Sequence, residues 1–296
     1  MANLKDLRDR INSVQSTKKI TSAMKLVAGA RLKKAQTEAE SSRPYANRMQ
    51  TIIDNVTSNI KNMENAPEII KGKENNKTHL IIVMTSDRGL CGGFNTAITK
   101  LVKNKIKNLL SSNKNIKIFC VGKKGQDHLK REYNDFIVDF VPISLQKKID
   151  YEFATKISNK ILLMYENQEF DVAHIFFSLF KSAIKQEAQL KQIIPVLTDV
   201  ENTQKKDENK NDEIYEYEPE EEEVLKNLVP QNVAIQIFSG LLENAAGEQG
   251  ARMTAMDNAT RNAGELIDTL KLNYNRSRQA QITNELIEVI SGAEAV

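Results

Sequence analysis

Two long stretches of this chain, one near each end, have apolar residues spaced three or four positions apart. The longer stretch runs from about Val229 to Ser291 and contains no proline after Pro230. The spacing predicts a helix, which at about 1.5 Å per residue would extend roughly 90 Å if unbroken. Its apolar positions form a narrow stripe, typical of a coiled-coil seam. They are Phe238, Leu242, Ala245, Met253, Met256, Ala259, Ala263, Leu266 and Leu270.

This stripe is poor in large side chains. It is rich in alanine, and Gln249, Arg252 and Asn273 interrupt it with polar groups, so it lacks much of the stability that large seam residues provide. Each glycine in the expected helix costs about 1 kcal/mol relative to alanine, which indicates that the backbone approaches a neighbour closely there. These glycines are Gly240, Gly247, Gly250 and Gly264. A long helix buried in a bundle is the alternative interpretation.

A second stripe at the start of the chain supplies a partner for this helix. It has the same spacing, with polar residues at Lys18, Thr21 and Lys25. Pro44 should end or kink the helix, because proline lacks an N–H and disfavours helical geometry in the residue before it. The apolar positions then resume at Met49, Ile52, Val56 and Ile60. The pattern predicts a kinked helical segment over residues 1–63.

Residues 78–198 show short apolar runs that alternate with helical periodicity. This alternation predicts an α/β domain, with a mainly parallel sheet whose two faces are covered by helices. We expect strands at His79–Thr85, Lys117–Val121, Phe136–Val141 and Val172–Leu179, and helices at Thr96–Leu110, Gln126–Arg131 and Tyr151–Tyr165. Gln192–Leu197 is a candidate edge strand because it contains Pro195.

The remaining segments connect these parts. Residues 64–77 indicate a linker, and residues 199–213 form a polar loop of low complexity. Residues 214–296 contain a short segment, an acidic helix start at Glu220 and the long terminal helix. Because the α/β domain lies between the two long helices in sequence, these helices should run antiparallel.

Composition limits the class of protein. The chain has 296 residues, 40% of them hydrophobic, and contains neither an apolar run of membrane-spanning length nor the apolar core of a signal peptide. We therefore expect a mature protein that does not span a membrane. Cys91 and Cys120 are its only cysteines, which favours a reducing compartment over a disulfide framework.

Charge is unevenly distributed although the net charge is only +3. Residues 1–34 carry nine Lys or Arg and two Asp, whereas residues 201–223 carry eleven acidic residues and three Lys. The basic helix could meet nucleic acid or an acidic membrane surface. Against nucleic acid, the first forty residues contain no aromatic side chain on which bases could stack. We expect this helix to meet acidic protein loops instead.

The candidate chemistry is concentrated in a glycine-rich loop, Ser86–Asn95, between a predicted strand and a predicted helix. Phosphate groups bind at this position in many α/β sheets. The spacing of Gly89, Gly92 and Gly93 matches neither common phosphate-binding motif, and no lysine follows the glycines. A structural turn is the favoured interpretation, and an α/β enzyme that binds a nucleotide here is the rival.

Cys91 could act as a nucleophile at a helix N-terminus, with a histidine brought to it by the fold, but a small buried thiol is the favoured interpretation. The histidines are His79, His128 and His174. They share no metal-ligand spacing with the cysteines, and Glu220–Glu223 lacks the alternation of a calcium loop, so we expect no metal or other cofactor.

Several blocks of the sequence resemble the gamma subunit of rotary, F-type ATP synthases. Near the C-terminus these are Ile282–Glu288 with Gly292–Ala295, Arg252–Thr260 and Tyr274–Ala280. The N-terminal block Ile11–Ala30 and the loop Ser86–Asn95 resemble the same family. The matches cover both long helices and the first turn of the α/β domain.

The resemblance implies a long antiparallel coiled coil with an inserted Rossmann-like α/β domain. It also implies the role of a central rotor, which couples proton flow through a membrane ring of c subunits to ATP synthesis and hydrolysis on a hexamer of alpha and beta subunits. In this family the chain itself is not catalytic, and its α/β domain, which forms the foot of the shaft, rests on the ring beside the epsilon subunit. By position, contacts with the hexamer fall on Lys18, Met24, Arg252, Gln279, Thr283 and Glu288, and contacts with the ring on Tyr215, Tyr217 and Glu218.

The sequence departs from some relatives in two ways. Residues 201–212 vary in the family and receive no role, and the cysteine-bearing regulatory insertion of chloroplast forms is absent. Without a recognisable transit peptide, the resemblance favours a peripheral protein on the cytoplasmic face of a bacterial inner membrane; a mature mitochondrial chain is the alternative.

Overall fold

The computed structural model describes residues 4–59, 67–73, 76–146, 148–196 and 221–294. The chain divides into two compact units. The first, which we call the coiled-coil unit, comprises Met1–Ala30 and Arg252–Val296; the second, the sheet unit, comprises Arg31–Ala251. The long helices α1 (Leu4–Asn59) and α7 (Glu221–Glu294) contribute residues to both units. The expected segments 1–63, 78–198 and 214–296 therefore divide the chain differently from its compact units.

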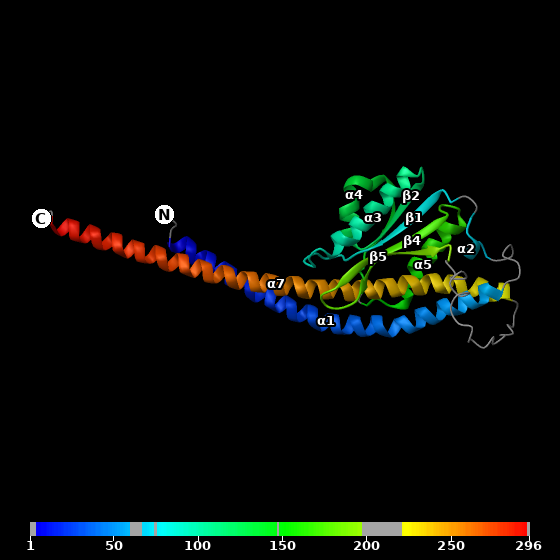
Figure 1. Ribbon diagram of the computed structural model, residues 1–296, viewed down its shortest axis with the longest axis horizontal. Helices are drawn as coiled ribbons and strands as arrows, with labels where there is room; N and C mark the ends of the chain where they lie inside the picture. Colours follow the sequence, from blue (N-terminus) through cyan, green and yellow to red (C-terminus); the bar gives the residue numbers. More distant parts are fainter. Residues whose placement is uncertain (1–3, 60–66, 74–75, 147, 197–220, 295–296) are drawn as a thin grey trace, which may run out of the picture. The chain divides into compact units, whose positions relative to one another are not determined.

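The sheet unit contains five strands and four further helices in addition to parts of α1 and α7, among the described residues (Figure 1). In chain order they are α2 (Glu68–Lys71), β1 (Thr78–Met84), α3 (Phe94–Ser111), β2 (Asn115–Val121), α4 (Lys123–Tyr133), β3 (Ile137–Val141), α5 (Tyr151–Glu166), β4 (Val172–Phe180) and β5 (Gln186–Ile194), with a 3₁₀ turn, η2 (Asn134–Phe136), before β3. The four strands and three helices expected within residues 79–179 are confirmed, with small shifts at their ends.

The strand order is β3-β2-β1-β4-β5, and the first four strands are parallel. β5 pairs antiparallel with β4 and lies at the edge. The expected edge strand exists, but its predicted bounds, Gln192–Leu197, were wrong. β5 begins at Gln186 and ends before Pro195, which has no N–H to donate to a ladder.

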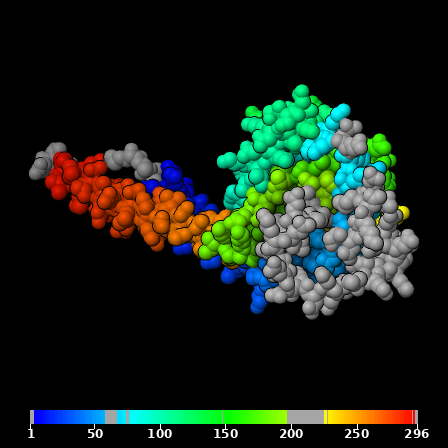
Figure 2. Space-filling view, turned by 45° about the vertical axis from the view of Figure 1, so that its right-hand side comes forward, coloured from blue at the N-terminus to red at the C-terminus, as the bar shows by residue number. Residues whose placement is uncertain are grey.

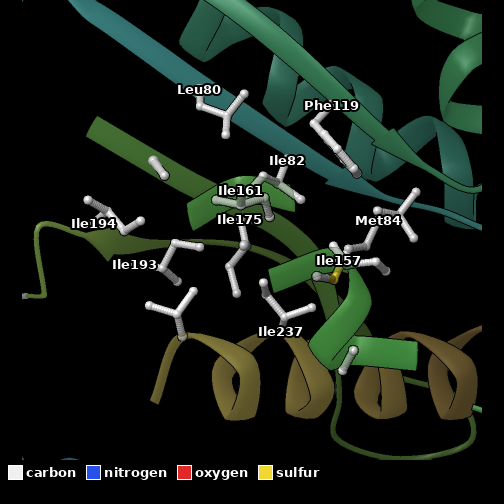
Figure 3. Close-up of a cluster of buried hydrophobic side chains, with 14 of the residues drawn as sticks. Leu80, Ile82, Met84, Phe119, Ile157, Ile161, Ile175, Ile193, Ile194 and Ile237 are labelled. Atoms are coloured by element: carbon white, nitrogen blue, oxygen red, sulfur yellow. The ribbon is translucent and has the colours of Figure 1, made fainter. Parts of the chain in front are cut away.

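Both faces of the sheet are buried, and β1 shows how the layers are built. Its side chains at Leu80, Ile82 and Met84 join a core with α5 and α7 (Figure 3), whereas Ile81 and Val83 join another with α3 and α4. Alternate side chains of a strand point to opposite faces, so a strand buried on both sides becomes a continuous apolar run. This explains why β1 was recognisable in the sequence.

α1 continues without a break through Pro44 to Asn59, so the expected continuation beyond the proline is confirmed. Residues 60–63 lie outside the described part. The stripe beyond Pro44 was wrong at one position, because Ile52 is 40% exposed whereas Ile53 is fully buried. Three-and-four spacing from Met49 leads to Ile53 and then Val56, which keeps the buried positions on one face.

α7 serves two different environments. In the sheet unit Val233, Ile237 and Leu241 complete the core against the sheet, so this part is not only a coiled-coil seam. Further along, the predicted stripe was wrong at Leu266, which is 41% exposed, while the adjacent Ile267 is 6% exposed.

Candidate functional site

The glycine-rich loop is held together by its own polar side chains. Asn95, in the first turn of α3, accepts a hydrogen bond from the Ser86 N–H at 3.0 Å and donates to Ser86 Oγ at 2.8 Å. Asp87 accepts from the backbone N–H of Lys123 at 2.6 Å and from that of Ser144. A carboxylate therefore occupies the N-terminus of α4, one of the places where a phosphate would bind.

α7 lies close to the carboxyl ends of the central strands. α3 follows β1 on one face of the sheet and α5 precedes β4 on the other, so the topological switch point lies between these neighbouring strands. α7 passes this point with Gly247, where an added Cβ would lie 3.0 Å from Phe94 Cε2 and 3.4 Å from Ser178 Oγ. The expected close approach at Gly247 is confirmed, and its neighbour is the α/β domain. These contacts favour a structural turn over a nucleotide site.

The two cysteines are buried. Cys91 is 2% exposed, and its Sγ lies 3.3 Å from Asn95 Nδ2, which donates to it. Burial raises the pKa of the Cys120 thiol to about 12. Among the described residues no group of three or more His, Cys, Asp or Glu side chains is placed to hold a metal ion.

Two of the histidines form a buried pair that the sequence did not reveal. His79 on β1 and His174 on β4 stack with ring centroids 5.6 Å apart, and they are 6% and 5% exposed. Both nitrogens of His79 and Nδ1 of His174 have no hydrogen-bond partner among the described residues. Burial and the nearby Lys105 ammonium lower the pKa of both rings, that of His174 to about 3. The pair is therefore neutral in the folded protein at neutral pH.

We expect the pair to make the sheet unit sensitive to acid. The His174 pKa is lower in the folded state than in the unfolded state, so the unfolded state takes up a proton first as the pH falls. The stability of the fold is therefore highest above about pH 6.5 and decreases as the pH falls toward about 3. Between pH 7.5 and 5 the loss should reach about 2 kcal/mol. Urea unfolding at a series of pH values should show a shallower pH dependence for His174→Phe. The control Ile106→Val should lower stability equally at each pH, and an unchanged slope in His174→Phe would contradict the assignment.

The coiled-coil unit pairs the first part of α1 with the last part of α7. Thr260 Oγ1 donates to Thr21 Oγ1 at 2.8 Å, and Lys25 Nζ lies 2.6 Å from Asp257 Oδ1. As the residue number rises along α1, from Thr21 to Lys25, the number of the partner on α7 falls, from Thr260 to Asp257. The helices are therefore antiparallel, as expected. Figures 1 and 2 both show the blue start of α1 along the orange part of α7. The Lys25 ammonium, through a hydrogen bond, lowers the pKa of Asp257.

The side chains that meet inside this helix pair are small or polar. An added Cβ on Gly264 would lie 3.2 Å from Lys18 Nζ, so the end of the lysine side chain lies against α7 at this glycine. The Lys25 and Asp257 side chains are 43% and 49% exposed, and such an ion pair contributes about 0 to 1 kcal/mol. The expected Ala-rich, partly polar seam is present.

Large apolar side chains instead face outward on both helices. α1 exposes Ile20, Leu26 and Val27, and α7 exposes a longer set near its end. These are Leu272, Ile282, Leu286, Ile287, Val289 and Ile290. Soluble proteins seldom expose so many large apolar groups close together unless another surface covers them. The unit is therefore a candidate interaction surface.

The structure places most of the predicted hexamer contacts on this unit's surface. Lys18, Gln279, Thr283 and Glu288 are exposed, and Met24 is half-buried. Arg252 is different, with only 8% of its surface exposed, so it is suited to supporting a contact. The predicted ring contacts Tyr215, Tyr217 and Glu218 lie outside the described residues.

Sequence reasoning did not single out Asp257 or the outward apolar residues of α7. The sequence did contain a signal for these apolar residues. Ile282, Leu286 and Ile290 follow a four-residue spacing beyond Leu270, the last position of the predicted seam. In the part of the chain that the structure describes, no helix is long and apolar enough to cross a membrane.

Comparisons with known proteins agree with this architecture. The solved structures most similar in fold include two of the Euglena gracilis mitochondrial ATP synthase. The first, a rotor, has a TM-score of 0.64, 18% identity, and coverage of 94% of this chain and 98% of that chain. The second, an assembly with the c-ring, has a TM-score of 0.66, 18% identity, and coverage of 99% and 94%. At this level of identity the likeness concerns the fold.

The sequence matches are closer. The ATP synthase gamma chain of Pelagibacter ubique is 52% identical over 296 residues, and that of Paracoccus denitrificans is 49% identical over 296 residues; each match covers 100% of both chains. A model of the family described as ATP synthase matches residues 3–296. With matches along its whole length, the chain belongs to the ATP synthase gamma chain family.

Proposed function

We propose that the chain is the central rotor shaft of an ATP synthase. It couples proton flow through a ring of c subunits to ATP synthesis and hydrolysis on a hexamer of alpha and beta subunits, and it contributes no catalytic residue. The epsilon subunit lies beside its foot. Full-length relatives named as ATP synthase gamma chains support this proposal, as do neighbours in fold described as a rotor and as central stalk with c-ring.

The observation that carries the proposal is the surface of the coiled-coil unit. A shaft that turns inside a bearing needs outward contacts that form and break in succession, without one deep, permanent interface. Exposed apolar side chains on α7, such as Leu286 and Ile290, and surface charges such as Glu288 provide contacts of this kind. Coupling then arises because different angular positions have different contact free energies with each catalytic subunit.

The residues proposed to contact or support contact with the hexamer are Lys18, Met24, Arg252, Gln279, Thr283 and Glu288. Tyr215, Tyr217 and Glu218 are proposed to meet the c ring. The chain would work as a peripheral protein, because every contact assigned to it is with other subunits. The cytoplasmic face of a bacterial inner membrane is the location that the resemblance favours.

Reconstitution tests this function. Purified alpha and beta subunits should form a stable, active ATPase only when this chain is added, and the chain alone should hydrolyse no ATP. Turnover by the chain alone, or full assembly and activity without it, would contradict the proposal.

We expect Met24→Lys to impair coupling. The substitution places a charge on a half-buried position of the coiled-coil unit, where a contact with the hexamer would have to desolvate it. ATP-driven proton pumping in membrane vesicles should fall while ATP hydrolysis persists. Ala23→Lys adds the same charge at an exposed neighbour and is the matched control. Normal pumping by Met24→Lys would show that Met24 does not contact the hexamer.

A further inference from the structure

The sheet unit contains a cavity that the rotor function does not use. It has a volume of about 400 Å³ and lies among α1, α7 and the start of α5. Ile149, Ile235 and Leu242 supply aliphatic wall, and Ser41, Ser42 and Ser239 supply small polar groups. A concave, mostly apolar space with a few polar groups has the properties of a small-molecule site.

Three aromatic side chains from three separate elements line this cavity: Tyr45 on α1, Tyr151 at the start of α5 and Phe238 on α7. The rings of Tyr151 and Phe238 meet edge to face, with centroids 5.9 Å apart and an interplanar angle of 89°. Tyr45 and Tyr151 are 59% and 44% exposed, so they are accessible to a ligand. Aromatic groups converging from several directions are the usual surroundings of an organic cation, which the negative ring faces attract.

The charges at the cavity favour a cation, because carboxylates outnumber ammonium groups in its lining. Two carboxylates, Glu38 and Asp150, and one ammonium, Lys148, belong to its lining. Asp150 is engaged as the N-cap of α5, where its Oδ1 accepts from the Phe153 N–H at 2.9 Å. Glu38 lies 3.5 Å from Lys148 Nζ, in a pair whose side chains are 30% and 61% exposed. A pair this exposed is weak, so another cation can displace Lys148 from Glu38.

We propose that this cavity binds a small hydrophobic organic cation, of the arylalkylamine class. Its aromatic body lies among Tyr45, Tyr151 and Phe238, and its ammonium group replaces Lys148 beside Glu38. Buried apolar contact provides most of the affinity, and Glu38 selects the sign of the charge. All the residues that line the site belong to the sheet unit.

Three probes that share one ring system test the selection of charge. The full-length chain is titrated by calorimetry with 2-naphthylmethylammonium, neutral 2-naphthylmethanol and anionic 2-naphthoate. We expect the cation to bind at least about fivefold more tightly than the carboxylate, with the neutral probe between them. Equal or tighter binding of the carboxylate, or no saturable binding of the cation, overturns the proposal.

Variants at the rim give effects of opposite sign. Glu38→Gln should weaken binding of the cation by about fivefold, and Lys148→Gln should strengthen it by about twofold, because one removes an attraction and the other a competitor. Glu40→Gln, an exposed carboxylate on the same helix outside the cavity, should change nothing. Ser239→Trp should block the cavity and abolish binding. If Glu38→Gln behaves like Glu40→Gln, or if Ser239→Trp folds and binds as before, the site is wrong.

Discussion

Replacing Arg43 with alanine is expected to lower the free energy of unfolding of the sheet unit by about 3 to 5 kcal/mol. Arg43 Nε and Nη2 donate to the Glu243 carboxylate at 2.6 and 3.0 Å, and Nη2 also donates to the Phe180 carbonyl at 2.8 Å. Glu243 accepts from the Phe180 N–H as well, and its side chain is only 3% exposed. The substitution would leave this carboxylate charged and buried without its cation.

The matched control is Lys160→Ala, which breaks the pair with Asp139, whose partners are 55% and 36% exposed. This change should cost at most about 1 kcal/mol, because water can solvate the remaining carboxylate. Denaturant unfolding of both variants measures the difference. The Arg43 side chain is itself 40% exposed. A loss in Arg43→Ala no larger than that in Lys160→Ala would show that the pair of Arg43 with the buried Glu243 carboxylate does not hold α1, α7 and β4 together.

The largest functional effect is expected for Arg252→Ala. Arg252 is 8% exposed on α7 within the coiled-coil unit, so its guanidinium is suited to holding neighbouring groups in position. If it supports a contact that differs between angular states, its loss should lower coupled ATP synthesis by about tenfold, within the usual range of coupling free energies. Assembly of the complex should persist.

Synthesis is measured in inverted membrane vesicles, and assembly by co-purification of the alpha and beta subunits. Arg261→Ala is the control, since Arg261 is exposed on the same helix and donates to Asn258 Oδ1 one turn away at 2.6 Å. An equal loss of ATP synthesis in both variants, or no loss in Arg252→Ala, would show that Arg252 has no specific role in coupling.

Much of the fold was predictable, because each element had a distinct burial period. β1, β2 and β4 are buried on both faces and therefore form apolar runs, and α1 keeps its three-and-four spacing through Pro44. β5 was misplaced because most of its residues are only partly buried or exposed, so Gln186–Ile194 contains few apolar residues. An edge strand of this kind gives little sequence signal beyond its proline.

The errors in the stripes have a simple cause. Ile52 and Ile53 are adjacent, as are Leu266 and Ile267, and composition alone does not decide which of two neighbouring apolar residues faces inward. The glycines of α7 correctly indicated close approach, but the sequence did not show that Gly240 and Gly247 face Met84 and Phe94.

Only part of the candidate site could be predicted from the sequence. The polar seam with Lys18 followed from the spacing of the residues, whereas Glu288 was named only through the resemblance; the roles of both stay predictions. Arg43–Glu243 and His79–His174 were not predictable, because their partners are far apart in the sequence and meet only when the sheet and helices are assembled.

The most direct test of the rotor is observation of turning. Cys91 and Cys120 are 2% and 0% exposed, whereas Lys107 lies exposed on α3, so Lys107→Cys offers a selective attachment point for a bead. With the alpha and beta hexamer anchored to glass and ATP supplied, the bead should turn continuously in one direction. A bead that stays still, or only fluctuates, while the anchored hexamer hydrolyses ATP at its full rate would contradict the account.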